Sequence, residues 1–219
     1  MTFDLLVFDG DGTLMDSEAR IVASLTAAFE DLDQPPPAPE RSRDIIGLGL
    51  NEAMQRLWPE STPAQRGRLI ERYRHHFLVA NHTPTPLFPG AADVIAALHA
   101  AGYLLAVATG KSRRGLDMAL AQSGLGAYFH ATRCADESFS KPHPQMLMEL
   151  MDETGSSAAA SLMIGDTEFD LEMARNAGVS SLAVCYGAHA PERLLAFKPL
   201  ACLSNIEALP GWLAKMVPA

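Results

Sequence analysis

Runs of consecutive apolar residues are the strongest pattern along the chain. Runs of this kind, without polar alternation, are typical of strands buried on both faces of a parallel sheet. The clearest predicted strands cover residues 4–9, 104–109, 161–165 and 181–185, and weaker ones cover residues 128–132 and 201–203. Apolar residues recur at helical spacing in the segments between them, which are residues 91–101, 113–122, 144–154 and 168–177. This alternation of strand and helix predicts an α/β fold with a doubly wound parallel sheet.

The segment between the first predicted strand and residue 90 has a different pattern. It shows helical spacing but no strong strand, and its helical stretches cover residues 18–32, 51–57 and 64–79. A crossover between parallel strands needs far fewer residues, so we expect a helical domain inserted after the first strand. The predicted division is a core of residues 1–16 and 86–219 and an all-helical cap of residues 17–85. Such a cap would stand over the sheet edge where open α/β sheets bind ligands.

Composition narrows the class of protein further. The apolar fraction of 48% and the charged fraction of 20% are those of a globular chain. A net charge of −9 disfavours a partner with a negative field, so we expect neither nucleic acid nor an anionic membrane as a partner. The most membrane-like window, residues 91–110, contains Asp93 and His99 and is interrupted by Gly102, so we interpret it as a helix followed by a strand.

The cysteines and the N-terminus bear on the compartment. Cys134, Cys185 and Cys202 are widely spaced and form no CxxC pair, so we expect three buried thiols and no disulfide framework. No targeting segment is apparent, because acidic residues occur early and no basic region precedes the first apolar run. Together these features predict a cytoplasmic protein. We expect a monomer or a weak homodimer.

Polar side chains follow the predicted strands at the points where the apolar runs stop. They are Asp9, Asp11 and Thr13 after the first strand, Thr109, Gly110 and Lys111 after the second, Lys141 further on, and Asp166 and Asp170 after the strand at 161–165. Because the carboxyl ends of parallel strands meet at one edge, these groups should converge there. Four gathered carboxylates repel one another unless a cation lies between them. Mg²⁺ takes carboxylate, phosphate and water oxygens, so the sequence predicts a Mg²⁺ site that also receives a phosphoryl group.

In this order, the motifs Asp9-x-Asp11-Gly-Thr13, Thr109, Lys141 and Gly-Asp166-x-x-x-Asp170 resemble the four motifs of the haloacid dehalogenase superfamily. Four ordered motifs are far more specific than any one of them. The inserted helices resemble the C1 cap of the branch that holds phosphoglycolate phosphatases and β-phosphoglucomutases.

The resemblance implies a role for each motif residue. Asp9 would be the nucleophile that forms an aspartyl-phosphate, and Asp11 the general acid and base. Thr109 and the Gly110 amide would bind the phosphoryl oxygens, and Lys141 would neutralise charge. The implied Mg²⁺ ligands are Asp9, the Asp11 carbonyl, Asp166 and, directly or through a neighbour, Asp170.

The cap and its border supply the candidates for recognising the rest of the substrate. Arg43-x-x-x-Gly47 resembles the cap motif that contacts substrate in β-phosphoglucomutase and in cap-bearing phosphatases. Lys111 follows a strand end and is a further candidate for substrate contact. Arg20 is a candidate to face the cleft as well. We interpret five other cap arginines as surface charges, namely Arg41, Arg66, Arg68, Arg72 and Arg74.

Within the family, the residues favour a Mg²⁺-dependent phosphatase acting on a small phosphorylated metabolite, of the phosphoglycolate or sugar-phosphate type. Asp11 argues against a dehalogenase, which has no leaving oxygen to protonate. A phosphosugar mutase stays open as an alternative, although the chain lacks a histidine near the start of the cap, where mutases usually carry one. A non-catalytic signalling or binding protein that is phosphorylated on aspartate is the third alternative.

Overall fold

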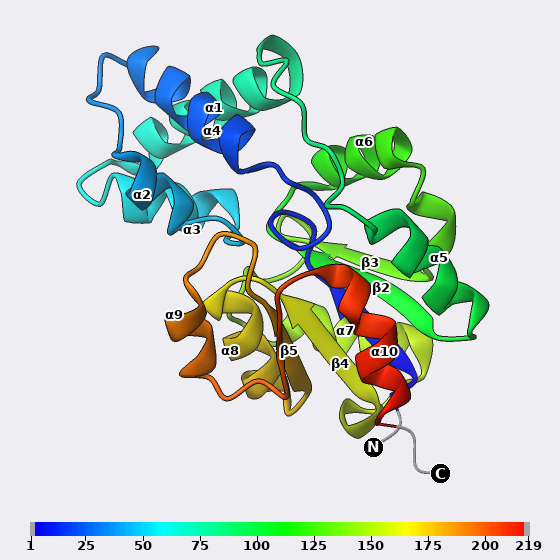
Figure 1. The fold of residues 1–219 in the computed structure, drawn as a ribbon. Coiled ribbons are helices and arrows are strands. Elements are labelled where there is room, and N and C mark those ends of the chain that lie inside the picture. The colour runs from blue at the N-terminus through cyan, green and yellow to red at the C-terminus, as the bar shows by residue number, and fades with distance from the viewer. Residues whose placement is uncertain (1–2, 217–219) are drawn as a thin grey trace.

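A six-stranded parallel sheet forms the centre of the core in the computed structural model, which describes residues 3–216 (Figure 1). The strands are β1 (Leu5–Phe8), β2 (Leu104–Thr109), β3 (Ala131–Cys134), β4 (Ser161–Gly165), β5 (Ser180–Val184) and β6 (Cys202–Leu203). Their spatial order is β3-β2-β1-β4-β5-β6. The chain therefore reverses its winding direction between β1 and β4, and open α/β sheets bind ligands at that reversal. The prediction of a doubly wound parallel sheet is confirmed.

Helices cover both faces of the sheet because side chains alternate between the faces along each strand. One face carries residues such as Leu6, Phe8 and Leu105 and packs against α5 (Ala91–Ala100) and α10 (Leu209–Ala214). The opposite face carries residues such as Val7 and Met163 and packs against α7 (Gln145–Thr154) and α8 (Glu168–Ala177). Two further core helices are α6 (Arg113–Ser123) and α9 (Pro191–Leu195).

Four helices between β1 and α5 form a layer above the carboxyl end of the sheet, as Figure 1 shows in blue and cyan. They are α1 (Glu18–Glu30), α2 (Pro39–Arg43), α3 (Leu50–Leu57) and α4 (Pro63–His75), and α4 continues into a π-helical turn, His76–Ala80. These helices bury their own apolar cluster, which includes Leu25, Met54 and Leu69. Phe169 of α8 joins that cluster, so the cap packs directly on the core.

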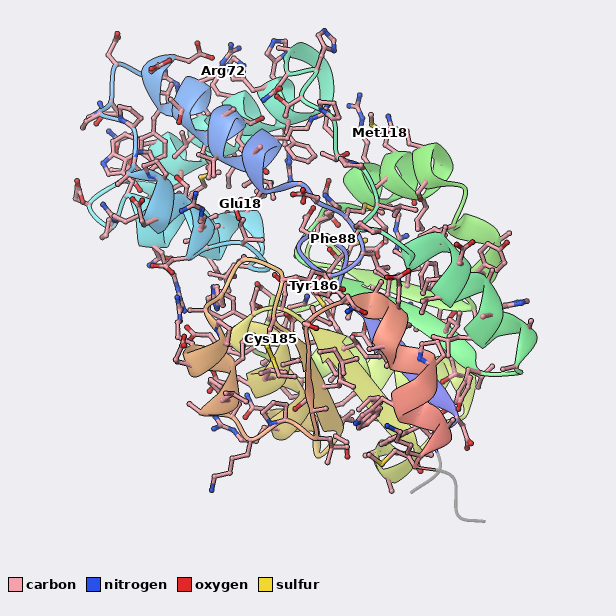
Figure 2. All side chains as sticks on the ribbon, in the orientation of Figure 1. Glu18, Arg72, Phe88, Met118, Cys185 and Tyr186 are labelled. Carbon is pink, nitrogen blue, oxygen red and sulfur yellow. A yellow bond between two sulfur atoms is a disulfide. The ribbon has the colours of Figure 1, made fainter. Side chains whose placement is uncertain are left out.

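The two chain segments that join cap and core lie side by side. The Asp16 amide donates to the Pro86 carbonyl over 2.8 Å, and the Phe88 amide donates to the Leu14 carbonyl over 3.0 Å. The ring of Phe88, in the second of these segments, contacts the ring of Tyr186 at a centroid distance of 4.6 Å (Figure 2). The two segments that join cap and core are therefore packed against the loop that follows β5 (Ser180–Val184).

Some local predictions need correction. The third strand begins three residues later than predicted, because residues 126–128 form a 3₁₀ turn, Gly126–Tyr128. The short helices α2, α9 and α10 were not predicted, and each is too short to show apolar periodicity.

The prediction of three free thiols is wrong for Cys185 and Cys202, which form a disulfide across the neighbouring ends of β5 and β6. Their separation of 17 residues gave no sign that these two strand ends are adjacent. Cys134 is a buried free thiol, as expected, and burial raises its pKa to about 12. In the described part of the chain, no helix is long and apolar enough to cross a membrane.

Candidate active site

Asp9 lies directly after β1 and is buried at the edge of the sheet. One of its carboxylate oxygens, Oδ1, accepts the Gly10 amide over 2.6 Å and lies 2.9 Å from Lys141 Nζ. The other oxygen, Oδ2, is buried and has no hydrogen-bond partner among the described residues. Because burial disfavours the charged form and the Asp170 carboxylate adds to this effect, the pKa of Asp9 rises to about 7 despite Lys141.

Asp166 lies directly after β4, across the reversal point from Asp9. Its Oδ1 accepts the Thr13 hydroxyl and its Oδ2 accepts the Ala188 amide, each over 2.8 Å. Gly12, at φ 77°, is required for this approach, since a Cβ atom there would lie 2.0 Å from Asp166 Oδ2. Burial, with the neighbouring carboxylates of Asp9 and Asp170, holds the pKa of Asp166 well above its usual range.

Asp170 lies in the first turn of α8 and has two functions in the fold. Its Oδ2 accepts the backbone amide and the hydroxyl of Thr167 and so caps the helix. Its Oδ1 lies 2.7 Å from Lys141 Nζ. Burial lowers the pKa of Lys141, but the carboxylates of Asp170 and Asp9 outweigh it and raise that pKa above its ordinary value.

The carboxylates of Asp9, Asp166 and Asp170 offer oxygens that all lie within 4.8 Å of one another. When all three carboxylates are ionised, they and the one ammonium group of Lys141 carry a net charge of −2 in a buried site, so burial and mutual repulsion raise the pKa values of Asp9 and Asp166 when no cation is bound. A divalent cation balances that charge, and hard cations prefer oxygen ligands. Asp9 Oδ2 is buried without a partner, and Asp166 and Asp170 each bring a carboxylate oxygen close to it, so the residues fit a Mg²⁺ ion held by this cluster.

The Asp11 side chain points away from this cluster, toward the cap. Its Oδ1 lies 2.7 Å from Lys111 Nζ and accepts a short hydrogen bond from the Ser17 hydroxyl. Ser17 is the residue before α1, and its hydroxyl binds Asp11 instead of capping the helix. The carboxylates of Asp9 and Asp11 therefore have different surroundings. That of Asp9 belongs to the acidic cluster, and that of Asp11 lines the pocket beneath the cap.

Thr109 ends β2 and is buried, and its Oγ1 accepts the Lys111 amide over 3.2 Å. The same oxygen lies near Gly10, the residue after Asp9, where a Cβ atom would be 3.5 Å away. Gly110 packs against the cap at close range: a Cβ atom there would lie 2.5 Å from the Leu48 carbonyl oxygen and 2.7 Å from that of Gly47. The cap loop containing Gly47 therefore sits directly on the end of β2.

Arg43 is not brought into the pocket. Its guanidinium group forms an ion pair with Glu18, and its side chain is 43% exposed. Two other contacts hold cap and core together. The Gly49 amide donates to the Ser140 hydroxyl over 2.8 Å, and Arg193 pairs with Asp44 of the cap.

Several site residues were not predicted from the sequence. Tyr73, Arg74 and Phe77 line the pocket beside Asp11, and Arg74 is also exposed, as predicted for a surface charge. The spacing of Tyr73 and Phe77, four residues apart in a helix, is a signal that could have placed them on one face. The Ala188 amide reaches Asp166 from the loop after β5, and a backbone donor of this kind leaves no signal in the sequence.

Comparisons with known proteins show the family to which the chain belongs. A family model described as haloacid dehalogenase-like hydrolase matches residues 6–184. The chain is 33% identical over 213 residues to the probable phosphatase IndB of Dickeya dadantii, covering 94% of this chain and 92% of that protein. It is 31% identical over 188 residues to a phosphoglycolate phosphatase of Agrobacterium fabrum, covering 84% and 81% of the two chains.

The chain therefore belongs to the haloacid dehalogenase-like hydrolases, as its motifs predict. Solved structures share the whole fold. A hydrolase from Pseudomonas syringae superposes with a TM-score of 0.89 at 23% identity, covering 100% of both chains. A predicted phosphoglycolate phosphatase from Haemophilus somnus gives a TM-score of 0.88 at 24% identity, covering 96% of this chain and 98% of that one.

Proposed function

We propose that this hydrolase is a Mg²⁺-dependent phosphatase that cleaves a small phosphomonoester through an aspartyl-phosphate on Asp9. The observation that carries the proposal is the buried Asp9 carboxylate, fixed by Lys141 and Gly10 through Oδ1 and unpartnered at Oδ2. A carboxylate held rigidly beside a cation site is suited to in-line attack on phosphorus. The relatives named phosphatase and phosphoglycolate phosphatase support the same class of substrate.

In the first step, an Asp9 oxygen forms a bond to phosphorus while the bond from phosphorus to the leaving oxygen breaks. Asp11 gives its proton to the leaving alkoxide. In the second step, Asp11 takes a proton from water, the water oxygen attacks phosphorus, and the bond to Asp9 breaks. Inorganic phosphate leaves and the Asp9 carboxylate is restored.

The neighbouring residues stabilise the charge that develops. Lys141 lies within 3 Å of Asp9 and would contact the phosphoryl oxygens. The Thr109 hydroxyl and the Gly110 amide would bind the same oxygens, as the family motifs imply. Asp170 is a positioning residue for Lys141. Bound Mg²⁺, held by Asp9, Asp166 and the Asp11 carbonyl, would supply electrostatic stabilisation of the phosphoryl oxygens.

The cap of residues 17–85 would close over the core of residues 1–16 and 86–219 about the paired segments near residues 16 and 86. Closure excludes water from the reacting groups. The backbone hydrogen bonds between those two segments fix them at one crossing point, which suits a hinge.

The test is phosphate release from a panel of small phosphate esters, with Mg²⁺ and with a chelator. We expect release that requires Mg²⁺ and is abolished in Asp9→Asn, while the variant keeps its circular dichroism spectrum. Full activity in Asp9→Asn would overturn the assignment of the nucleophile. Interconversion of isomeric sugar phosphates without release would identify the chain as a mutase, and neither activity would favour the signalling or binding alternative.

A further inference from the structure

The disulfide between Cys185 and Cys202 closes a loop that reaches both the acidic cluster and the cap. The loop covers residues 186–201, includes α9 and is drawn in orange in Figure 1. Cys185 directly follows β5, and Cys202 begins β6, a strand of two residues at the edge of the sheet. The pairing between β5 and β6 extends over two residues of each strand. The disulfide is therefore a large part of what holds the two ends of this loop together.

The first part of the loop holds Asp166. The Ala188 amide donates to Asp166 Oδ2 over 2.8 Å, and the His189 amide donates to the Asp166 carbonyl over 3.4 Å. Gly187 permits this approach, because a Cβ atom there would lie 2.3 Å from the Asp166 Cβ atom. Loss of a donor that orients a metal-binding side chain typically costs about 10–100-fold in metal affinity. The position of the loop therefore bears on the affinity of the acidic cluster for a cation.

The second part of the loop contacts the cap and α8. Arg193 of α9 donates to Glu168 of α8 over 2.9 Å and to Asp44 of the cap over 2.5 Å. Leu194 is buried in a small apolar cluster with Leu171 of α8, and the two cysteines of the disulfide pack against the same cluster. One covalently closed loop thus contacts the Asp166 carboxylate, the helix that carries Asp170, and the cap.

The disulfide is open to thiol reagents. Cys185 and Cys202 are half-buried, whereas Cys134 is buried, and exchange of a disulfide requires access to its sulfur atoms. A dithiol transfers two electrons and two protons to the pair: the bond between the sulfur atoms breaks, two cysteine thiols form, and the dithiol becomes a cyclic disulfide. After reduction, the far end of the loop is held mainly by the short β6 strand, and short pairings at a sheet edge open readily.

We propose that the Cys185–Cys202 disulfide is a reversible redox site that controls the order of the loop of residues 186–201 and, through Asp166, the affinity for Mg²⁺. The oxidised pair holds the loop where the Ala188 amide orients the Asp166 carboxylate. Reduction by a dithiol allows the loop to move, so this donor is lost for part of the time. The effect on affinity rests on the Mg²⁺ site of the proposed function, whereas the effect on the loop does not.

The number of free thiols tests whether the pair is oxidised and reducible. Thiols are counted with 5,5′-dithiobis(2-nitrobenzoate) in denaturant, before and after treatment with dithiothreitol. We expect one free thiol in protein purified without reductant and three after reduction, since the chain has three cysteines. Three free thiols before reduction would overturn the proposal.

The Mg²⁺ dependence of the melting temperature tests the coupling to the metal site without turnover. We expect the half-saturating Mg²⁺ concentration to rise about tenfold on reduction, the lower end of the usual cost of losing an orienting donor. The double variant Cys185→Ser with Cys202→Ser should match the reduced protein with and without reductant. The same half-saturation in the oxidised and reduced proteins, even with a lower melting temperature after reduction, would overturn the coupling.

Cys134→Ser is the matched control. It places a hydroxyl group in a separate apolar cluster, with Val107 and Leu116, and should lower the melting temperature while keeping the full redox response. A redox response that persists in the double variant, or is lost in Cys134→Ser, would overturn the assignment to Cys185 and Cys202.

Hydrogen exchange in chelator separates this inference from the proposed function. We expect the amides of residues 186–201 to exchange faster after reduction, while those of α5, on the opposite face of the sheet from α8, are unchanged. Faster exchange without any Mg²⁺ stabilisation in either state would support redox control of the loop and overturn the Mg²⁺ site of the proposed function. Mg²⁺ stabilisation with equal loop exchange in both states would support the Mg²⁺ site and overturn the redox site.

Discussion

The Lys141 ammonium nitrogen lies 2.9 Å from Asp9 Oδ1 and 2.7 Å from Asp170 Oδ1, and the three side chains are at most 1% exposed. Burying each of these three groups costs desolvation free energy, and its attraction to the oppositely charged neighbour offsets that cost. Removing one partner leaves the others uncompensated. The Lys141 ammonium group thus stabilises the fold through these ion pairs, and in the proposed mechanism it also contacts the phosphoryl oxygens.

Lys141→Met should therefore lower both stability and activity. We expect the free energy of unfolding in chelator to fall by about 3–5 kcal/mol, the usual cost of breaking a buried pair, and turnover to be lost. Urea denaturation and phosphate release measure the two effects. Lys215→Met, at an exposed position after α10, is the matched control and should change neither. An unchanged urea midpoint in Lys141→Met would show that the ion pairs contribute nothing to folding.

Stability without metal should fall as the pH rises. The pKa of Asp9 is about 7 in the folded protein, against 3.8 in an unperturbed chain. Between these values the unfolded chain has released a proton that the folded protein retains, so the free energy of unfolding decreases with rising pH and levels off above about pH 7. We expect a loss on the order of 1 kcal/mol or more, measured by urea denaturation in chelator from pH 4.5 to 8.

Mg²⁺ should reverse this trend, because it stabilises the ionised carboxylates. Its stabilising effect is expected to grow from pH 5 to pH 8, and Asp9→Asn should show a flatter profile in chelator than the unmodified protein. A profile in chelator that rises over this range would contradict the assigned pKa shift.

Asp11→Asn and Asp166→Asn should separate chemistry from metal binding. The Asp11 side chain is bound to Lys111 and Ser17, whereas the Asp166 carboxylate belongs to the buried acidic cluster. We expect Asp11→Asn to slow turnover by about 10²–10⁴-fold, the usual worth of general acid–base catalysis, with Mg²⁺ affinity retained. Asp166→Asn should lose Mg²⁺ affinity, measured by the Mg²⁺ dependence of the melting temperature. Equal losses of affinity in the two variants would refute this division of roles.

The sheet could be predicted from the sequence because buried parallel strands leave a direct signal. Uninterrupted apolar runs identified β1, β2, β4 and β5, and the polar residues that end them marked the site edge. Asp9 and Asp166 meet as expected, because they follow β1 and β4, the neighbouring strands at the reversal point. Lys141 was predicted at the same edge because it lies in the loop after the third predicted strand, although several residues separate it from the end of β3.

The cap side of the site could not be predicted in the same way. Which cap residues border the pocket beside Asp11 depends on how the cap helices pack on the core, and the sequence pattern does not determine that packing. Arg74 and Arg68 are both exposed arginines on α4, and only the fold shows that Arg74 borders the pocket. The disulfide between Cys185 and Cys202 depends likewise on the adjacency of two strand ends.

Gly110→Ala should hinder cap closure. The added Cβ would meet two backbone carbonyl oxygens of the cap, those of Leu48 and Gly47, at 2.5 and 2.7 Å, and backbone atoms cannot move aside as a flexible side chain can. To remove this steric clash, the cap loop that contains Gly47 and Leu48 must move away from the end of β2. We expect KM to rise about tenfold, as for a misplacement of binding groups, and proteolysis at the segments joining cap and core to become faster. Gly67→Ala is the control, because a Cβ there has no neighbour within 4 Å, and it should leave both quantities unchanged. Unaltered KM and proteolysis in Gly110→Ala would show that this contact does not govern closure.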